Sequence, residues 1–323
     1  MRKTCLDMVA AMADRDPRVV FIGSDLSPGL LAGMKEKHPD RYHMEGVSEQ
    51  HIVGMAAGMA MDGWIPYVNT IATFITRRCY EQVAVDLCLH DLPVRLIGNG
   101  GGLVYAPLGP THQAIEDIAI MRALPNMTIV APADAEEMKR FMEVSLDWPH
   151  PIYIRLAKGG DTVVTGGFDR FAIGKGYLLR EAAGGRDAPV LLVGTGIGST
   201  RALGAAERLA DDGIACHVLH LPTVKPLDAD ALLELARPAR LVVTVEEHTT
   251  IGGLGSAVTD LLVERMDGRV PRMRRIGIPD AFVRRYGGQD DLLADVGITP
   301  DAIAATVRDA LGGHGVGHGD AHG

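Results

Sequence analysis

The segment from Gly46 to His51 places one carboxylate, Glu49, immediately before a run of small and apolar residues. Between Ile52 and Met61 the small residues let another backbone approach closely, and almost no polar side chain is present. A helix formed here is therefore expected to lie buried inside an assembly. Burial would partly desolvate Glu49 and suit it to share a proton with a ligand nitrogen. A glutamate that only accepts hydrogen bonds from free N–H groups at a helix start is the alternative.

Length and composition indicate a chain of two globular domains. The sequence has 323 residues, of which 47% are hydrophobic and 23% charged, enough for two well-filled cores. The net charge of -9 and the pI of about 5.7 argue against binding to nucleic acid or to an anionic membrane. Four cysteines, Cys5, Cys79, Cys88 and Cys216, show no CxxC or metal-like spacing, so we expect reduced thiols and no disulfides.

The N-terminal residues give no sign of a targeting segment. Asp7 and Asp14 interrupt the first apolar stretch, so a signal peptide is not expected, and no apolar run is long enough to span a bilayer. These features predict a soluble cytoplasmic protein.

Short apolar runs alternate with longer amphipathic stretches, which is the pattern of a parallel sheet flanked by helices. The runs predict strands at 19–23, 67–70, 94–97, 127–131, 152–155, 190–193, 215–219 and 241–245. The amphipathic stretches predict helices at 52–61, 74–89, 115–122, 135–146, 200–209, 229–236 and 254–266. Asp134 is expected to cap the helix that follows it. The fold class is therefore α/β, with two doubly wound domains.

Domain boundaries follow from a change in composition after the fifth strand. A stretch rich in glycine and weak in helical period separates the two halves. We predict a first domain at 1–165, a linker at 166–187, a second domain at 188–311 and a disordered tail of glycine and histidine at 312–323.

Two local patterns could be mistaken for binding sites. Gly194-Thr195-Gly196-Ile197-Gly198 follows a predicted strand, but Ser199 stands where a dinucleotide fingerprint needs its third glycine, so a tight strand-to-helix turn is favoured. His314, His318 and His322 recur every four residues, but neighbouring glycines disfavour the helix that would let them chelate a metal.

Further motifs follow Glu49 in a fixed order: Asn69 to Phe74, Arg77 and Arg78, Leu92-Pro93-Val94, and a glycine-rich loop ending Gly109-Pro110-Thr111-His112-Gln113. In order and content they resemble the pyrimidine-binding domain of the transketolase family of thiamine diphosphate enzymes, which includes 1-deoxyxylulose-5-phosphate synthase. The likeness continues through Met121 to Met127, Ala131 to Asp134, Glu246-Glu247-His248 and Gly252 to Gly255. It covers nearly all of the chain before the tail and is nearest to the separately encoded C-terminal half of a two-part transketolase.

The resemblance implies a role for each main site residue. Glu49 would hydrogen-bond N1′ of the cofactor's aminopyrimidine and so promote removal of the thiazolium C2 proton. Phe74 would stack on the pyrimidine ring, although an ordinary core phenylalanine is the alternative. His112 would reach substrate oxygens near the reacting carbon as a donor or proton relay.

Cationic residues suggest a charged substrate. Lys158 stands where the resemblance implies an arginine that binds a sugar phosphate, and a lysine offers a point charge in place of a fork. Of Arg77 and Arg78, one is expected to face the entrance and the other to be a solvated helix residue. Asp25 matches an aspartate near the cofactor and the subunit interface, with a simple turn residue as the alternative.

One motif of the family is missing from the sequence. The resemblance implies a Gly-Asp-Gly segment with a downstream asparagine that holds the diphosphate and Mg²⁺, and this chain contains no such segment. A separate diphosphate-binding subunit is therefore expected to supply that motif and the magnesium ligands, in an α2β2 hetero-oligomer. The apolar helix at 52–61 should be buried against this partner or against a second copy.

Leu108 departs from the pattern that the resemblance implies. An aspartate four residues before His112 usually bonds substrate hydroxyls, and a leucine cannot accept such a bond, which would leave a buried hydroxyl unpaired at a cost of roughly 1–3 kcal/mol. We expect a specialised donor or acceptor, such as a modified sugar phosphate or another anionic sugar.

The resemblance as a whole implies a subunit of a two-component transketolase that transfers a two-carbon ketol unit from a ketose to an aldose. The C-terminal domain is expected mainly to support oligomerisation. The alternatives are a β subunit of a 2-oxoacid or acetoin dehydrogenase, a 1-deoxyxylulose-5-phosphate synthase-like enzyme, and a catalytically silent regulatory subunit.

Overall fold

The first sheet is built from the apolar runs of the sequence, because a strand covered on both faces needs apolar side chains throughout. The computed structural model describes residues 1–26, 28–157, 159–182 and 190–312. In spatial order the sheet contains β10 (Thr223–Lys225), β5 (Thr128–Val130), β6 (Ile152–Leu156), β4 (Arg95–Asn99), β3 (Ile65–Ile71), β1 (Val19–Gly23) and β2 (Tyr42–Met44). β10 is antiparallel to β5, and the other neighbours are parallel.

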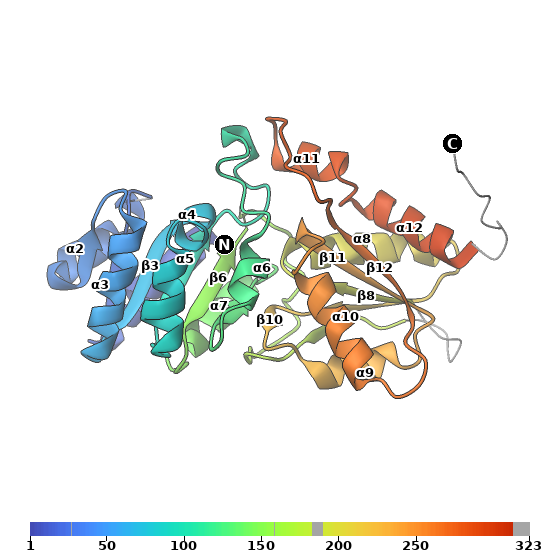
Figure 1. The fold of residues 1–323 in the computed structure, drawn as a ribbon, viewed down its shortest axis with the longest axis horizontal. Helices are drawn as coiled ribbons and strands as arrows, with labels where there is room; N and C mark the ends of the chain where they lie inside the picture. The colour runs from blue at the N-terminus through green and yellow to red at the C-terminus, as the bar shows by residue number, and fades with distance from the viewer. Residues whose placement is uncertain (27, 158, 183–189, 313–323) are drawn as a thin grey trace.

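Helices cover both faces of this sheet (Figure 1). One face packs against α1 (Arg2–Arg15) and α7 (Ala135–Ser145), and the other against α3 (Glu49–Met61), the π-helix η3 (Val83–Leu89) and α6 (Asp117–Arg122). Short elements complete the domain: η1 (Pro28–Leu31), α2 (Ala32–Lys37), η2 (Pro39–Arg41), α4 (Ala72–Thr76), α5 (Tyr80–Gln82) and η4 (Ala106–Leu108). Asp134 caps α7 as predicted, accepting from the backbone N–H groups of Glu136 and Glu137.

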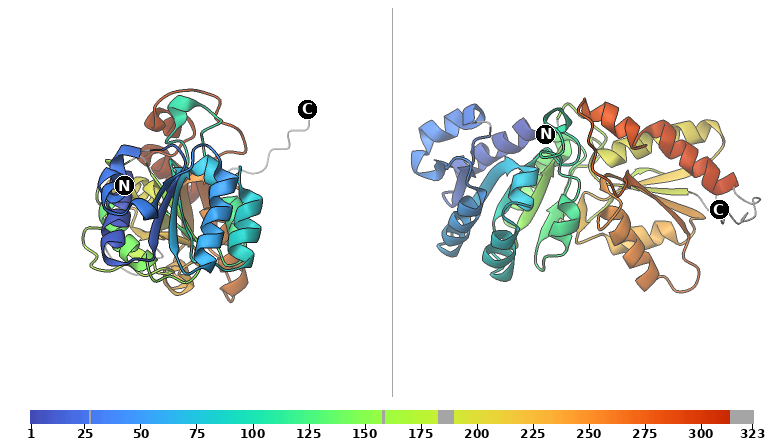
Figure 2. Two further views of the ribbon diagram at one scale, coloured as in Figure 1. Left: turned by 90° about the vertical axis from the view of Figure 1, so that its left-hand side faces the viewer. Right: turned by 45° about the horizontal axis from the view of Figure 1, so that its top comes forward.

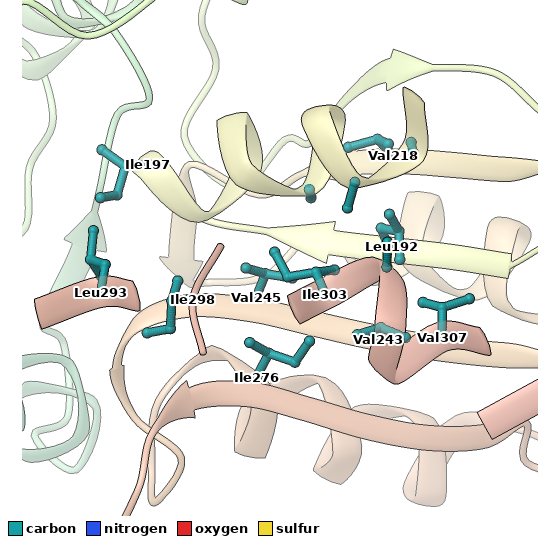
Figure 3. Close-up of a cluster of buried hydrophobic side chains, with 14 of the residues drawn as sticks. Leu192, Ile197, Val218, Val243, Val245, Ile276, Leu293, Ile298, Ile303 and Val307 are labelled. Atoms are coloured by element: carbon teal, nitrogen blue, oxygen red, sulfur yellow. The ribbon is translucent and has the colours of Figure 1, made fainter. Parts of the chain in front are cut away.

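The second sheet repeats the doubly wound plan with five strands. Their order is β12 (Arg272–Ile278), β11 (Leu241–Thr249), β8 (Val190–Gly194), β9 (Cys216–His220) and β7 (Tyr177–Arg180), with β7 antiparallel. The helices are α8 (Ile197–Asp211), α9 (Ala229–Ala236), α10 (Leu254–Arg265), α11 (Gln289–Asp295) and α12 (Pro300–Gly312). Figure 3 shows the apolar layer between these strands and the helices α8 and α12. The predicted fold class is confirmed.

Two segments cross the domain limits that the sequence suggested. β7 lies within the predicted linker, yet it pairs with β9 at the edge of the second sheet. β10 lies within the predicted second domain, yet it extends the first sheet beside β5. Both are short edge strands, whose few residues give too weak an alternation to be recognised in a sequence.

The predicted single helix at 74–89 is broken in the structure. α4 ends at Thr76, the chain turns through Arg77 and Arg78, and a π-helix follows from Val83. Successive residues of an unbroken helix point about 100° apart, whereas the turn brings both arginines to one pocket. The π-helix that follows the turn is a form of helix that is frequent at functional sites.

The helix α3 is buried on one side only within this chain. Ile52, Val53 and Ala56 are buried, whereas Gly58 and Met61 lie on an exposed side. A Cβ atom built on Gly58 would have no neighbour within 4 Å. The expectation that a partner or a second copy covers this side remains a prediction.

The glycine pattern after β8 forms a tight strand-to-helix turn, as favoured from the sequence. Gly196 has a φ of +52°, and a Cβ atom on Gly198 would lie 2.3 Å from the carbonyl oxygen of Val245. These glycines let α8 approach β11. The four cysteines are free and buried, and no helix in the described part of the chain is both long and apolar enough to cross a membrane. His314, His318 and His322 lie outside the described residues.

Candidate active site at the carboxyl ends of the first sheet

The predicted site residues follow different parallel strands, whose carboxyl ends meet at one edge of the sheet. Asp25 follows β1, Glu49 follows β2, Phe74 follows β3 and His112 follows β4. Lys158 follows β6 but lies outside the described residues. The topology therefore gathers side chains that are far apart in the sequence.

Glu49 is the first residue of α3, and only 1% of its side chain is exposed. One carboxylate oxygen accepts a hydrogen bond from Arg78 Nη1 at 2.7 Å, and Thr70 Oγ1 lies 3.5 Å from the other. Ser24 Oγ lies 2.8 Å from Thr70 Oγ1 and 3.2 Å from Oδ1 of the exposed Asp25. Both contacts of the Glu49 carboxylate come from side chains, so its environment differs from that of a glutamate that only accepts backbone N–H groups.

Phe74 lies beside this carboxylate and presents its ring to two planar groups. Cζ of Arg78 lies 4.0 Å from the ring centre, and the His112 ring meets Phe74 edge-on with the centroids 5.2 Å apart. The Arg78 guanidinium thus stacks on Phe74 while it donates to Glu49. The site therefore holds a flat hydrogen-bond donor that stacks on the Phe74 ring and donates to the buried Glu49 carboxylate.

A pocket of about 720 Å³ opens in front of Phe74. The described residues that line it include three arginines and no carboxylate. They are Thr73, Phe74, Arg77, Arg78, Pro110, Thr111, Phe282 and Arg284. Thr73 Oγ1 is buried and has no hydrogen-bond partner among the described residues. An arginine-lined pocket with an unsatisfied hydroxyl suits a polar, negatively charged ligand.

Arg77 and Arg78 are both exposed and both line this pocket, so the pocket lining does not distinguish one that faces the entrance from one that is only solvated. Arg77 Nη1 lies 2.9 Å from Glu116 Oε1, and its Nη2 donates to the carbonyl oxygen of Thr111 at 3.4 Å. Both side chains reach the pocket because α4 ends at Thr76 and the two arginines lie on the turn that follows it. Their role in substrate binding remains a prediction.

His112 lies on the glycine-rich loop and is half-buried. Its backbone N–H donates to the carbonyl oxygen of Gly109 at 3.0 Å, and Nδ1 lies 2.9 Å from Thr111 Oγ1. Leu108, on the same loop, is 51% exposed. Within the described residues, no group of three or more His, Cys, Asp or Glu could hold a metal ion.

A second polar cluster lies where the two domains meet, and the sequence gave it no role. Arg155 Nε donates to Asp117 Oδ2 at 2.7 Å, and its Nη2 donates to the carbonyl oxygen of Glu247 at 2.8 Å. The Glu247 carboxylate accepts from the backbone N–H of Leu103 and from Gln289 Nε2. The Glu246-Glu247-His248 motif was the available signal, but only the fold shows what it contacts.

Glu247 should make stability depend on pH. Burial raises the pKa of its carboxyl to about 7, although Arg155, Gln289 and Leu103 oppose the shift. The unfolded chain loses this proton near the ordinary pKa of 4.5, so the stability that Glu247 contributes falls as pH rises from about 4.5 to about 7. We therefore expect the free energy of unfolding of Glu247→Gln, measured relative to that of the parent chain, to be higher at about pH 8 than at about pH 5. Urea unfolding of the variant and the parent chain at both pH values measures this gain. The control Glu36→Gln, at an exposed position, should show no such change. A variant that loses stability relative to the parent chain as pH rises would contradict the assignment.

Two models of known protein families match most of this chain. Residues 1–160 match the model for the transketolase pyrimidine-binding domain, and residues 179–303 match the model for the transketolase C-terminal domain. The chain belongs to the transketolase family. This family depends on thiamine diphosphate, in agreement with the resemblance noted from the sequence.

Curated relatives of this transketolase-family chain fall into two size classes. A transketolase family protein of Sinorhizobium fredii is 40% identical over 306 residues, covering 94% of this chain and 86% of the relative. The 6-deoxy-6-sulfo-D-fructose transketolase subunit of a Clostridium species is 35% identical, covering 96% and 94%. The 1-deoxy-D-xylulose-5-phosphate synthase of a Synechococcus species is 38% identical, covering 92% and 45%. The chain therefore spans about half the length of such synthases.

A solved structure agrees with the smaller size class. It is described as a split gene transketolase in an inactive β4 tetramer, with 34% identity and a TM-score of 0.86. The match covers 96% of this chain and 98% of that one.

Proposed function

We propose that this chain is one subunit of a two-component, thiamine diphosphate-dependent transketolase that transfers a two-carbon ketol unit from an anionic ketose to an aldose. The observation that carries the proposal is the buried Glu49 carboxylate beside the Phe74 ring at the mouth of an arginine-lined pocket. The similarity over full length to a split transketolase chain and to a sulfofructose transketolase subunit supports it.

The residues present fit the aminopyrimidine of the cofactor. Arg78 already makes the two contacts that such a ring needs, a hydrogen bond to Glu49 and stacking on Phe74. Binding of the cofactor therefore requires Arg78 to turn away. Thr73 Oγ1 offers a further unused polar atom in the same pocket.

Each residue has a task that its chemistry supports. When bound, thiamine diphosphate supplies the thiazolium carbon to which the two-carbon unit is attached. Glu49 exchanges a proton with the pyrimidine nitrogen N1′, Phe74 holds the ring flat, and His112 donates a hydrogen bond to a substrate oxygen. Arg77 offers N–H donors in the same pocket to the oxygens of an anionic sugar.

The diphosphate and Mg²⁺ are assigned to a separate subunit with a Gly-Asp-Gly motif. The similar solved structure is described as an inactive β4 tetramer, an assembly of one chain type. That this chain type is inactive without another supports the need for a second subunit. The exposed side of α3 offers a surface for it, and Leu89 on the neighbouring η3 is 72% exposed. An α2β2 assembly follows if each subunit supplies half of every site.

A synthase of the deoxyxylulose phosphate type is the second candidate, because these enzymes match 92% of the chain at 38% identity. The two candidates differ in the donor, which is a ketose for a transketolase and a 2-oxoacid for the synthase. Co-expression with a chain that carries the Gly-Asp-Gly motif, followed by assays with ketose and pyruvate donors, tests the proposal. Ketol transfer supports the transketolase, and decarboxylation of pyruvate without ketol transfer contradicts it.

Phe74→Ala is expected to weaken cofactor binding about tenfold, since stacking of a base on an aromatic ring is worth about 1–3 kcal/mol. Calorimetric titration of the reconstituted complex with thiamine diphosphate measures the effect. Phe168→Ala is a matched control, because Phe168 is also half-buried but packs against Tyr177 in another part of the chain. Equal affinities of the two variants would contradict the stacking role.

A further inference from the structure

A segment of the second domain closes one side of the pocket in front of Phe74. After β12 the chain returns toward the first domain, where Phe282 and Arg284 line the pocket together with Phe74 and Arg77. Figures 1 and 2 show this segment, which leads into α11, beside the loop that contains η4. The second domain thus contributes side chains to the candidate site, which oligomerisation alone does not require.

Tyr286, in the same segment, places its ring against the glycine-rich loop. Gly109 has a φ of +81°, and a Cβ atom built on it would lie 2.6 Å from the Tyr286 ring. Glycine allows both the backbone conformation and the close approach. The contact places the segment beside the loop that carries His112, and side chains from both domains line the same pocket.

Of the arginines that line the pocket, Arg284 has no carboxylate partner among the residues that the structure describes. Arg77 and Arg78 are each paired with a glutamate at less than 3 Å, at 2.9 and 2.7 Å. Arg284 is exposed and makes no hydrogen bond or ion pair with any residue that the structure describes. Because the chain carries a net charge of -9, an unpaired cation at this entrance is a local attraction for an anionic ligand.

We propose that Arg284 binds the anionic end group of the sugar substrate, a phosphate or a sulfonate on its terminal carbon. A guanidinium presents two parallel N–H donors that match the oxygens of such groups. This assignment rests on the proposed transketolase function and adds a specificity-determining residue from the second domain. The cofactor's diphosphate has the same chemistry, so the test must separate the two sources.

Kinetics of the complex with its partner subunit provide the test. Donors are compared in pairs that differ only at the terminal carbon: xylulose with xylulose 5-phosphate, and fructose with fructose 6-phosphate and with 6-deoxy-6-sulfofructose. Arg284→Gln is expected to raise KM for the anionic donors about tenfold, with little change for the neutral ones. Arg284→Lys, which keeps the charge without the fork, should recover part of the loss.

Arg285→Gln is the matched control. Arg285 is the next residue, but it pairs with Asp295 at 2.5 Å and does not line the pocket. Its KM values should equal those of the parent enzyme. The affinity for thiamine diphosphate, measured by calorimetry, should be the same in all variants.

Each other outcome overturns a defined part of the proposal. Weaker cofactor binding by Arg284→Gln with unchanged KM values would assign Arg284 to the cofactor's diphosphate and contradict substrate binding. If the parent complex transfers the ketol unit and Arg284→Gln has the same KM values for the anionic donors, the role of Arg284 is contradicted, but the proposed function is not. Absence of transfer with every donor would contradict the proposed function itself.

Discussion

Replacing Glu49 by glutamine is expected to lower the turnover number of the reconstituted enzyme about a thousandfold, within the range of losses seen for proton-transferring side chains. Glutamine keeps the shape of the side chain and can still hydrogen-bond to the pyrimidine ring. It cannot share a proton with N1′, which is the step assigned to this carboxylate. The fold should tolerate the change, because the partner of Glu49, Arg78, is 37% exposed and keeps access to water.

The measurement is ketol transfer at saturating thiamine diphosphate, with a cofactor titration to show that the variant is loaded. Glu45→Gln is a suitable control, because Glu45 is an exposed carboxylate in the connection just before α3. That control should retain the parent turnover number. If Glu49→Gln kept activity within a few-fold of the parent enzyme while loaded with cofactor, Glu49 would not be the proton-exchanging group.

Much of the fold could be predicted because burial dictates residue type. The strands at the centre of each sheet are covered on both faces, so they appear in the sequence as continuous apolar runs. α9 was predicted with its observed limits, Ala229–Ala236. Edge strands such as β2, β7 and β12 are partly exposed and carry mixed side chains, so their sequences lack that signal. Pairing of β10 with β5 depends on contacts between distant segments, which no local pattern contains.

The candidate site could be predicted as a set of residues but not as an arrangement. Motif order pointed to Glu49, Phe74 and His112, and the parallel topology explains why they share one edge of the sheet. The stacking of Arg78 on Phe74 depends on the break after Thr76, which helical periodicity does not reveal. The contribution of Arg284 depends on how the two domains pack, so a sequence read one domain at a time could not suggest it.

Domain packing also sets the second large effect, which concerns stability. Asp117 is fully buried, and Arg155 holds it with two hydrogen bonds, at 2.7 and 3.1 Å. Burial alone would raise the pKa of the Asp117 carboxyl, but the neighbouring Arg155 outweighs it and holds this pKa below its ordinary value. The guanidinium is therefore the main group that keeps this buried carboxylate charged, with help from the Tyr153 hydroxyl, which donates to Asp117 Oδ2 at 2.6 Å. Replacing Arg155 by methionine should lower the free energy of unfolding by about 3–5 kcal/mol, the usual cost of breaking a buried ion pair by removing one partner.

Urea unfolding near neutral pH measures the loss, with Arg285→Gln as the control, since that variant removes a surface ion pair worth about 1 kcal/mol or less. The double variant Arg155→Met with Asp117→Leu separates two explanations. If the loss comes from an uncompensated buried charge, removing that charge as well should restore most of the stability. If the double variant is as unstable as Arg155→Met, the loss comes instead from the other hydrogen bonds that the two side chains make. Arg155 donates to the carbonyl oxygens of Glu247 at 2.8 Å and Ala114 at 3.1 Å, and Asp117 accepts from the Tyr153 hydroxyl at 2.6 Å. A loss of about 1 kcal/mol or less in Arg155→Met would contradict both, because it would mean that the interior compensates Asp117 without its arginine.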